Sequence, residues 1–153
     1  MGSQFKPVIK SLIILHTAML FIQIVFAGIV YGISMQTKPS INENLSRILQ
    51  TAAVVLTLGG GTVAFVLFKK KISVLQETRN GFTEKINDYR TASIIKYALL
   101  ETPSLFCIIG YFLTQNISFL LLCVVLILVF AGQKPTVNMM MYDMNVSRDE
   151  LFE

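Results

Sequence analysis

Residues 93–113 read SIIKYALLETPSLFCIIGYFL and hold one acidic residue, Glu101, in an otherwise largely apolar segment. The run matches the roughly 20 residues that a helix needs to cross the hydrocarbon core of a bilayer. A carboxylate at that depth is costly, so it is expected to be shielded, paired or protonated, and such residues often mark ion or proton sites. The segment therefore predicts a transmembrane helix with Glu101 as its candidate functional residue.

Three further apolar segments lie at about residues 8–33, 48–68 and 117–132. The chain is 54% hydrophobic and only 14% charged, whereas a soluble domain carries about 25% charged residues. The sequence predicts an all-α membrane protein, with residues 1–153 forming a single domain of four transmembrane helices in an antiparallel bundle.

The connectors between these segments differ in kind. Thr114–Asn116 is a short polar turn, which predicts an antiparallel hairpin of the last two segments. Connector 69–92 is long and charged, and its apolar spacing indicates a helix interrupted near Asn80–Gly81 that extends beyond the membrane or lies on its surface. In the tail, residues 133–153, the run Ser147–Glu150 matches a capping box that would open a short helix.

Positive charge predicts the orientation. Connector 69–92 carries six Lys/Arg residues and the N-terminus carries Lys6 and Lys10, whereas residues 35–47 carry two. Cytoplasmic loops are enriched in Lys and Arg, so both termini and connector 69–92 are expected in the cytoplasm and the protein in the inner membrane. This topology accounts for the net charge of +4, and nucleic acid is not expected as a partner.

The first apolar segment has an alternative interpretation as a signal peptide. Val25–Ala27 has the small-residue spacing of a cleavage site, and lysines precede the apolar run. The apolar run continues past Ala27 to Ile33, which favours a retained transmembrane helix.

Three unusual features fall at similar depths. Counting eight residues inward from each cytoplasmic boundary, roughly 12 Å along a helix, reaches Glu101, the single histidine His16, and Gly60 at the centre of a triple glycine. Small residues let helices approach closely. The residues expected to pack helices are Gly59, Gly60, Gly61 and Ala64.

Polar side chains form two stripes at helical spacing. Tyr97, Glu101 and Ser104 share one face of their helix, and His16 and Gln23 lie seven residues apart on the first segment. The proposed ion-binding set is Glu101 with Tyr97, Ser104, Thr57 and His16, and the expected ligand is H⁺ or Na⁺.

Each of these residues also has a purely structural interpretation. A protonated Glu101 can simply hold two helices together, His16 can be a satisfied polar residue, and the glycines can be packing residues alone. Lys96 is expected to extend to the cytoplasmic surface. Pro103 is expected to kink its helix and free a carbonyl.

The sequence offers little for catalysis. Cys107 and Cys123 lie in apolar segments and are expected to be small buried side chains. We find no metal-ligand motif and no nucleophile–base pair, so no metal or cofactor is expected, and a membrane enzyme is only a third alternative.

Segment 93–113 also resembles a known family. Arg90-Thr91, then Ala98–Glu101, Pro103 and an apolar run ending in Gly110–Leu113 are similar to the second helix of the proteolipid c subunit of rotary ATP synthases and ATPases. The resemblance covers residues 48–113, and the rest of the chain is typical of a small bacterial membrane protein. By this resemblance Glu101 would be the proton- or sodium-binding carboxylate.

Two functions remain open from the sequence. In the first, the chain is a small transport or complex subunit whose carboxylate binds a proton or cation, embedded in the lipid bilayer and assembled as a homo-oligomer or within a larger complex. In the second, it is a structural or accessory membrane protein in which Glu101 only packs helices.

Overall fold

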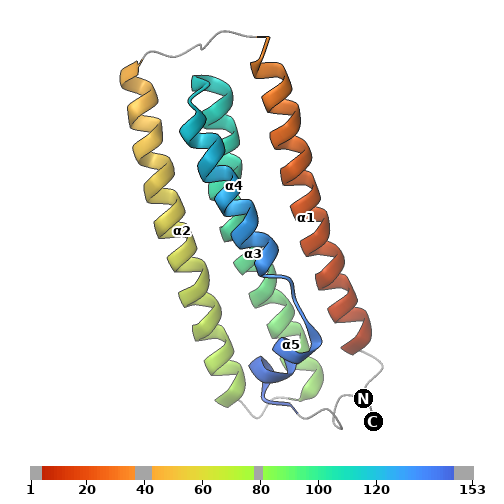
Figure 1. Cartoon of the computed structure of the whole chain (residues 1–153). Coiled ribbons are helices and arrows are strands. Elements are labelled where there is room, and N and C mark those ends of the chain that lie inside the picture. The colour runs from red at the N-terminus through yellow and green to blue at the C-terminus, as the bar shows by residue number, and fades with distance from the viewer. Residues whose placement is uncertain (1–4, 37–42, 78–80, 147–153) are drawn as a thin grey trace.

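The computed structural model describes residues 5–36, 43–77 and 81–146 (Figure 1). Nearly all of these residues are helical, and none of them forms a strand. The elements are α1 (Phe5–Ser34), α2 (Glu43–Glu77), α3 (Phe82–Thr114), α4 (Ile117–Gly132) and α5 (Val137–Met144). The all-helical prediction is therefore confirmed, whereas the predicted capping box at residues 147–150 falls outside the described residues.

Helices α2 and α3 extend well beyond the expected segments 48–68 and 93–113. Most of connector 69–92 is thus helical, since α2 ends at Glu77 and α3 begins at Phe82; of the predicted break at Asn80–Gly81, Asn80 lies outside the described residues. The physical reason lies in its apolar side chains, because Ile72, Leu75 and Ile86 are buried in the same core cluster. Packing of the two helices continues through the charged connector and keeps it helical.

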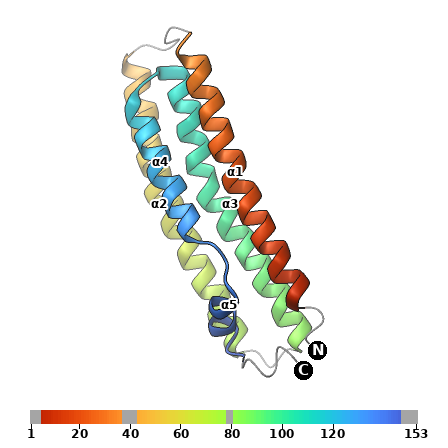
Figure 2. The same cartoon turned by 45° about the vertical axis from the view of Figure 1, so that its right-hand side comes forward.

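Helix α3 occupies the centre of the molecule. It packs against α1, α2 and α4, which lie around it (Figures 1 and 2). The exposed sides of the helices are themselves apolar, with side chains such as Phe21, Leu58 and Leu128 about two-thirds exposed. Three helices, α1, α2 and α3, are long and apolar enough to cross a membrane.

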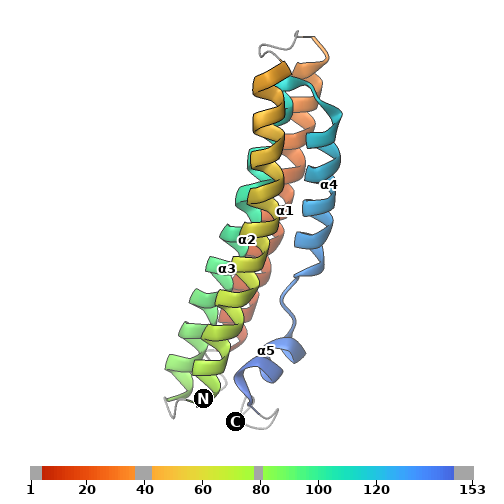
Figure 3. The ribbon, with the colours of Figure 1, turned by 90° about the vertical axis from the view of Figure 1, so that its left-hand side faces the viewer.

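Helix α4 is shorter and leads into a bend. It has 16 residues, and its axis makes an angle of 74° with that of α5. Counted together as one bent span, α4 and α5 bring the number of candidate membrane-spanning helices to four. Figure 3 shows α5 below the end of α4, turned across the lower part of the molecule.

The start of α1, the end of α2, the start of α3 and α5 gather at one end of the molecule (Figure 1). We call it the basic end, because the exposed lysines Lys10, Lys69, Lys70 and Lys71 lie there. The turn between α3 and α4 lies at the opposite end, where Asn116 caps α4 by accepting a hydrogen bond from the Ser118 amide.

The triple glycine contacts α3 through its central residue only. A Cβ atom added to Gly60 would lie 3.2 Å from Pro103 Cγ and 3.6 Å from the Leu99 carbonyl oxygen. A Cβ at Gly59 or Gly61 would meet nothing within 4 Å. Successive helix residues point about 100° apart, so only one of three adjacent glycines can face the same neighbour.

Candidate intramembrane polar site

Helices α1 and α3 are held in a parallel register by polar and aromatic pairs. Three contacts link residues that are each 81 positions apart in the sequence: His16 with Tyr97, Gln23 with Ser104, and Ser34 with Gln115. The two polar stripes predicted from the sequence therefore face each other along one seam.

Gln23 is the central residue of this seam. Its side chain is fully buried, and its Oε1 accepts a hydrogen bond from Ser104 Oγ at 3.1 Å. Its side chain also lies close to the carboxyl group of Glu101. The geometry stops short of a full hydrogen bond, because Gln23 Nε2 has no partner at hydrogen-bonding distance in the described part of the chain. A buried amide nitrogen left in this way is costly, so we expect it to be satisfied by Glu101 or by a ligand of Glu101.

Glu101 itself lies at the edge of the seam. Its side chain is half-buried, whereas the next residue, Thr102, is exposed and bonds back to the Ala98 carbonyl of its own helix. The carboxyl group is therefore partly covered by α1 and partly open to the surroundings of the bundle.

His16 is engaged away from Glu101. Its Nε2 lies 2.9 Å from the Phe130 carbonyl oxygen, which can only accept, so Nε2 carries the proton. The ring stacks on Phe130 at 4.7 Å between centroids and meets Tyr97 edge-on at 5.3 Å. The carbonyl belongs to the last turn of α4 and also accepts a hydrogen bond from the Gln133 backbone N–H at 2.9 Å. His16 thus adds a second donor at the end of α4.

The other predicted partners of Glu101 are also directed elsewhere. The Tyr97 hydroxyl points toward the Gln133 carbonyl at 3.5 Å, which is at most a weak hydrogen bond. Thr57 Oγ1 donates to the Ala53 carbonyl of its own helix. Of the predicted set, Ser104 alone is connected to Glu101, and the connection runs through Gln23.

Ser104 also reaches α4. Its Oγ lies 3.7 Å from Cys123 Sγ, and both cysteines of the chain are buried and free. Through Gln23 and Cys123, Ser104 joins α1, α3 and α4 at one level.

Gln23 was visible in the sequence as part of a stripe. Its role at the site depends on the register of α1 against α3, which sequence spacing within one helix does not determine.

A second polar cluster lies at the basic end, on the other side of α3. Lys96 is only 5% exposed, and its Nζ lies 4.5 Å from the centre of the Phe68 ring and 5.4 Å from that of Phe65. The expectation that Lys96 extends to the surface is wrong. Helix α5 covers this region, and the aromatic rings of α2 provide a cation–π contact in place of water.

Asp143 of α5 completes this second cluster. Its Oδ2 accepts a hydrogen bond from the Tyr89 hydroxyl at 3.2 Å, and its backbone carbonyl accepts one from Gln76 Nε2 at 2.9 Å. Asp143 and Lys96 also attract each other electrostatically. The charge of Lys96 is thus directed toward α2 and α5, and not toward Glu101.

Among the described residues, no three His, Cys, Asp or Glu side chains gather closely enough to hold a metal ion. No protein-family model, curated protein or solved structure matches this chain.

Proposed function

We propose that the chain is a multi-pass protein of the inner membrane, an antiparallel four-helix bundle in which α4 and α5 form the last, bent crossing. The basic end would face the cytoplasm. Support comes from the distribution of charge, because the exposed lysines of α1 and α2 lie at this end and cytoplasmic segments are enriched in Lys and Arg.

Within this bundle, we propose that Glu101 binds a proton or small cation and that the chain works as a small transport or complex subunit. The observation that carries the proposal is that the described partner of Glu101, the Gln23 side chain, is neutral. Gln23 can donate a hydrogen bond to a carboxylate but cannot compensate its charge. A carboxylate at membrane depth without a basic partner favours charge compensation by a bound ion.

A proton fits these surroundings better than a metal cation. Gln23 and Ser104, which are hydrogen-bonded to each other, are neutral side chains with one oxygen each, whereas hard cations such as Ca²⁺ and Mg²⁺ take six or more oxygen ligands. The resemblance of residues 48–113 to the proteolipid c subunit agrees with a proton- or sodium-binding carboxyl. The partly open position of Glu101 supports assembly with further copies or other subunits that would cover it.

The second candidate is a structural or accessory membrane protein. It is supported by the Ser104–Gln23 hydrogen bond, since polar pairs between membrane helices contribute to their association. In this case the Glu101 carboxyl adds only a further contact to the α1–α3 seam.

Dicyclohexylcarbodiimide, which attacks protonated carboxyls in apolar surroundings, tests the ion-binding proposal. We expect it to modify Glu101 selectively at neutral pH in the reconstituted protein, and higher pH or Na⁺ to slow the reaction. The exposed Glu43 and Glu77 are internal controls and should remain unmodified. Equal modification of all three glutamates, or none at Glu101, would contradict the proposal.

Infrared spectroscopy separates the two candidates. The band of the protonated Glu101 carboxyl group is assigned by its loss in the Glu101→Gln variant. If Glu101 exchanges protons, this band should titrate reversibly with pH. In the structural alternative, Glu101→Gln should leave both the pH response and the thermal stability unchanged, because glutamine keeps the shape and a hydrogen-bonding group.

A further inference from the structure

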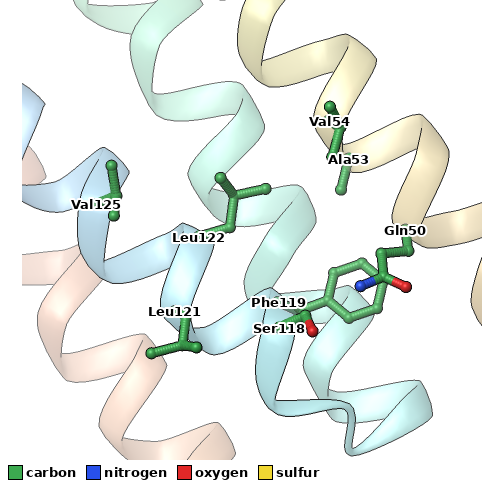
Figure 4. Close-up of a pocket in the computed structure, with 8 residues that line it drawn as sticks. All are labelled: Gln50, Ala53, Val54, Ser118, Phe119, Leu121, Leu122 and Val125. Carbon is green, nitrogen blue, oxygen red and sulfur yellow. The ribbon is translucent and has the colours of Figure 1, made fainter.

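A groove separates α2 from α4 in the half of the molecule away from the basic end. Its volume is about 330 Å³, and Figure 4 shows its lining by side chains of both helices. The lining residues are Gln50, Ala53, Val54, Ser118, Phe119, Leu121, Leu122 and Val125. The groove exists because α2 and α4 both pack chiefly on α3 and touch each other little.

The walls and the floor of the groove differ in exposure. Ala53 and Phe119 are almost completely buried and form its floor, whereas Val54, Leu121 and Val125 are 45–63% exposed on its rim. The small side chain of Ala53 leaves space that a larger residue would fill. Helix α2 is long and apolar enough to cross a membrane, so under the proposed insertion hydrocarbon and not water surrounds the apolar part of the groove.

The dimensions select the kind of occupant. From Ser118 to Val125 the groove follows α4 for roughly 10 Å, at 1.5 Å per residue. A helix with its side chains is about 10–12 Å wide, whereas the groove is a short depression of about 330 Å³ between two helices. These dimensions suit a single hydrocarbon chain lying along α4.

The polar residues of the groove lie at one end. Gln50 and Ser118 line the part nearest the start of α2 and the start of α4. Arg47 precedes Gln50 by one turn, so it lies on the same side of α2, and its side chain is exposed. In the described residues of this end (34–36, 43–50 and 111–118), Arg47 is the only Lys or Arg.

We propose that this groove binds one acyl chain of a phospholipid and that the Arg47 guanidinium holds the phosphate of the same molecule. Apolar walls suit the chain, and the planar guanidinium suits a phosphate at headgroup depth. Under the proposed topology the lipid belongs to the outer leaflet. The inference requires insertion into a membrane but does not depend on the chemistry of Glu101.

The acyl-chain part can be tested with the full chain reconstituted in vesicles of phosphatidylethanolamine and phosphatidylglycerol. A phosphatidylglycerol with a diazirine in the middle of one acyl chain should crosslink to Leu122 and Val125. Val54→Trp on one wall, or Leu121→Trp on the other, should fill the groove and reduce this labelling to background. Val55→Trp is the matched control, because Val55 is 63% exposed and does not line the groove.

The headgroup part is tested by Arg47→Gln. Binding of the same lipid should weaken about tenfold, the size expected for loss of a charged hydrogen bond, whereas Lys69→Gln at the basic end should leave it unchanged. Equal labelling in Val54→Trp and Val55→Trp would overturn the proposal. So would crosslinks from the groove to a second copy of the chain in place of lipid.

Discussion

Gln23 of α1 and Ser104 of α3 are hydrogen-bonded at 3.1 Å, and both side chains are almost completely buried. The pair sits in the middle of a seam whose three contacts share one sequence separation. A slip of one residue would turn Gln23 by about 100° around α1, so this hydrogen bond specifies the register that brings the amide to Glu101.

A double-mutant cycle should measure the Gln23–Ser104 hydrogen bond. We expect Gln23→Leu and Ser104→Ala each to lower the free energy of unfolding, with a coupling energy of about 0.6 kcal/mol, typical of hydrogen bonds between membrane helices. Unfolding in mixed micelles of a mild detergent and dodecyl sulfate provides the measurement. Strictly additive effects would show that the two side chains do not interact in the membrane.

The α2–α3 contact at Gly60 gives a second prediction. Gly60→Leu should destabilise the fold by about 1–3 kcal/mol, the usual cost of overpacking, because its side chain would meet Pro103 and the Leu99 carbonyl. Gly59→Leu is the matched control and should be nearly neutral, since its side chain would enter open space. Thermal melting of both variants in detergent compares them, and equal melting temperatures would refute the contact.

The position of α5 should depend on Asp143. Asp143→Ala removes the acceptor of the Tyr89 hydroxyl. It also removes the negative charge that lies near the buried, positively charged Lys96, so α5 should separate from α2 and α3. Met140 is fully buried and Tyr142 is 83% exposed. A maleimide should therefore react with Met140→Cys only when Asp143 is replaced, and with Tyr142→Cys in both backgrounds. Unchanged protection at position 140 would show that apolar packing alone holds α5.

The proposed topology can be checked with single cysteines at the two ends. Ser73→Cys and Asn44→Cys are both at exposed positions, at opposite ends of α2. An impermeant maleimide added to intact cells should label position 44 and not position 73. The buried Cys107 and Cys123 should stay unreactive. Labelling of position 73 from outside the cell would show that the orientation is opposite to the proposed one.

The all-helical character of the chain was predictable from the sequence, because long apolar blocks determine helices in lipid without reference to tertiary contacts. The helix ends were less predictable. The charged connector contains Ile72, Leu75 and Ile86 at helical spacing, and only their burial between α2 and α3 shows that both helices continue through it.

The candidate site was predicted less well than the fold. Of the predicted stripe on α3, Tyr97 and Ser104 contact α1, but the partners depended on how neighbouring helices dock. His16 is hydrogen-bonded to the Phe130 carbonyl at the end of α4, and Thr57 is hydrogen-bonded to the Ala53 carbonyl of its own helix. Lys96 was misplaced for the same reason, because the aromatic rings and the acid that surround it come from α2 and α5.

The central place of α3 has a consequence for how the protein is made. Of the three long helices α3 is the least apolar, and it is also the most enclosed by its neighbours. Lys96 and Glu101, in its apolar part, oppose partitioning of the isolated segment from the translocon into lipid. We therefore expect α3 to enter the bilayer together with α2, whose phenylalanines and Gly60 already present the matching surface, so that insertion of this helix and its folding occur as one event.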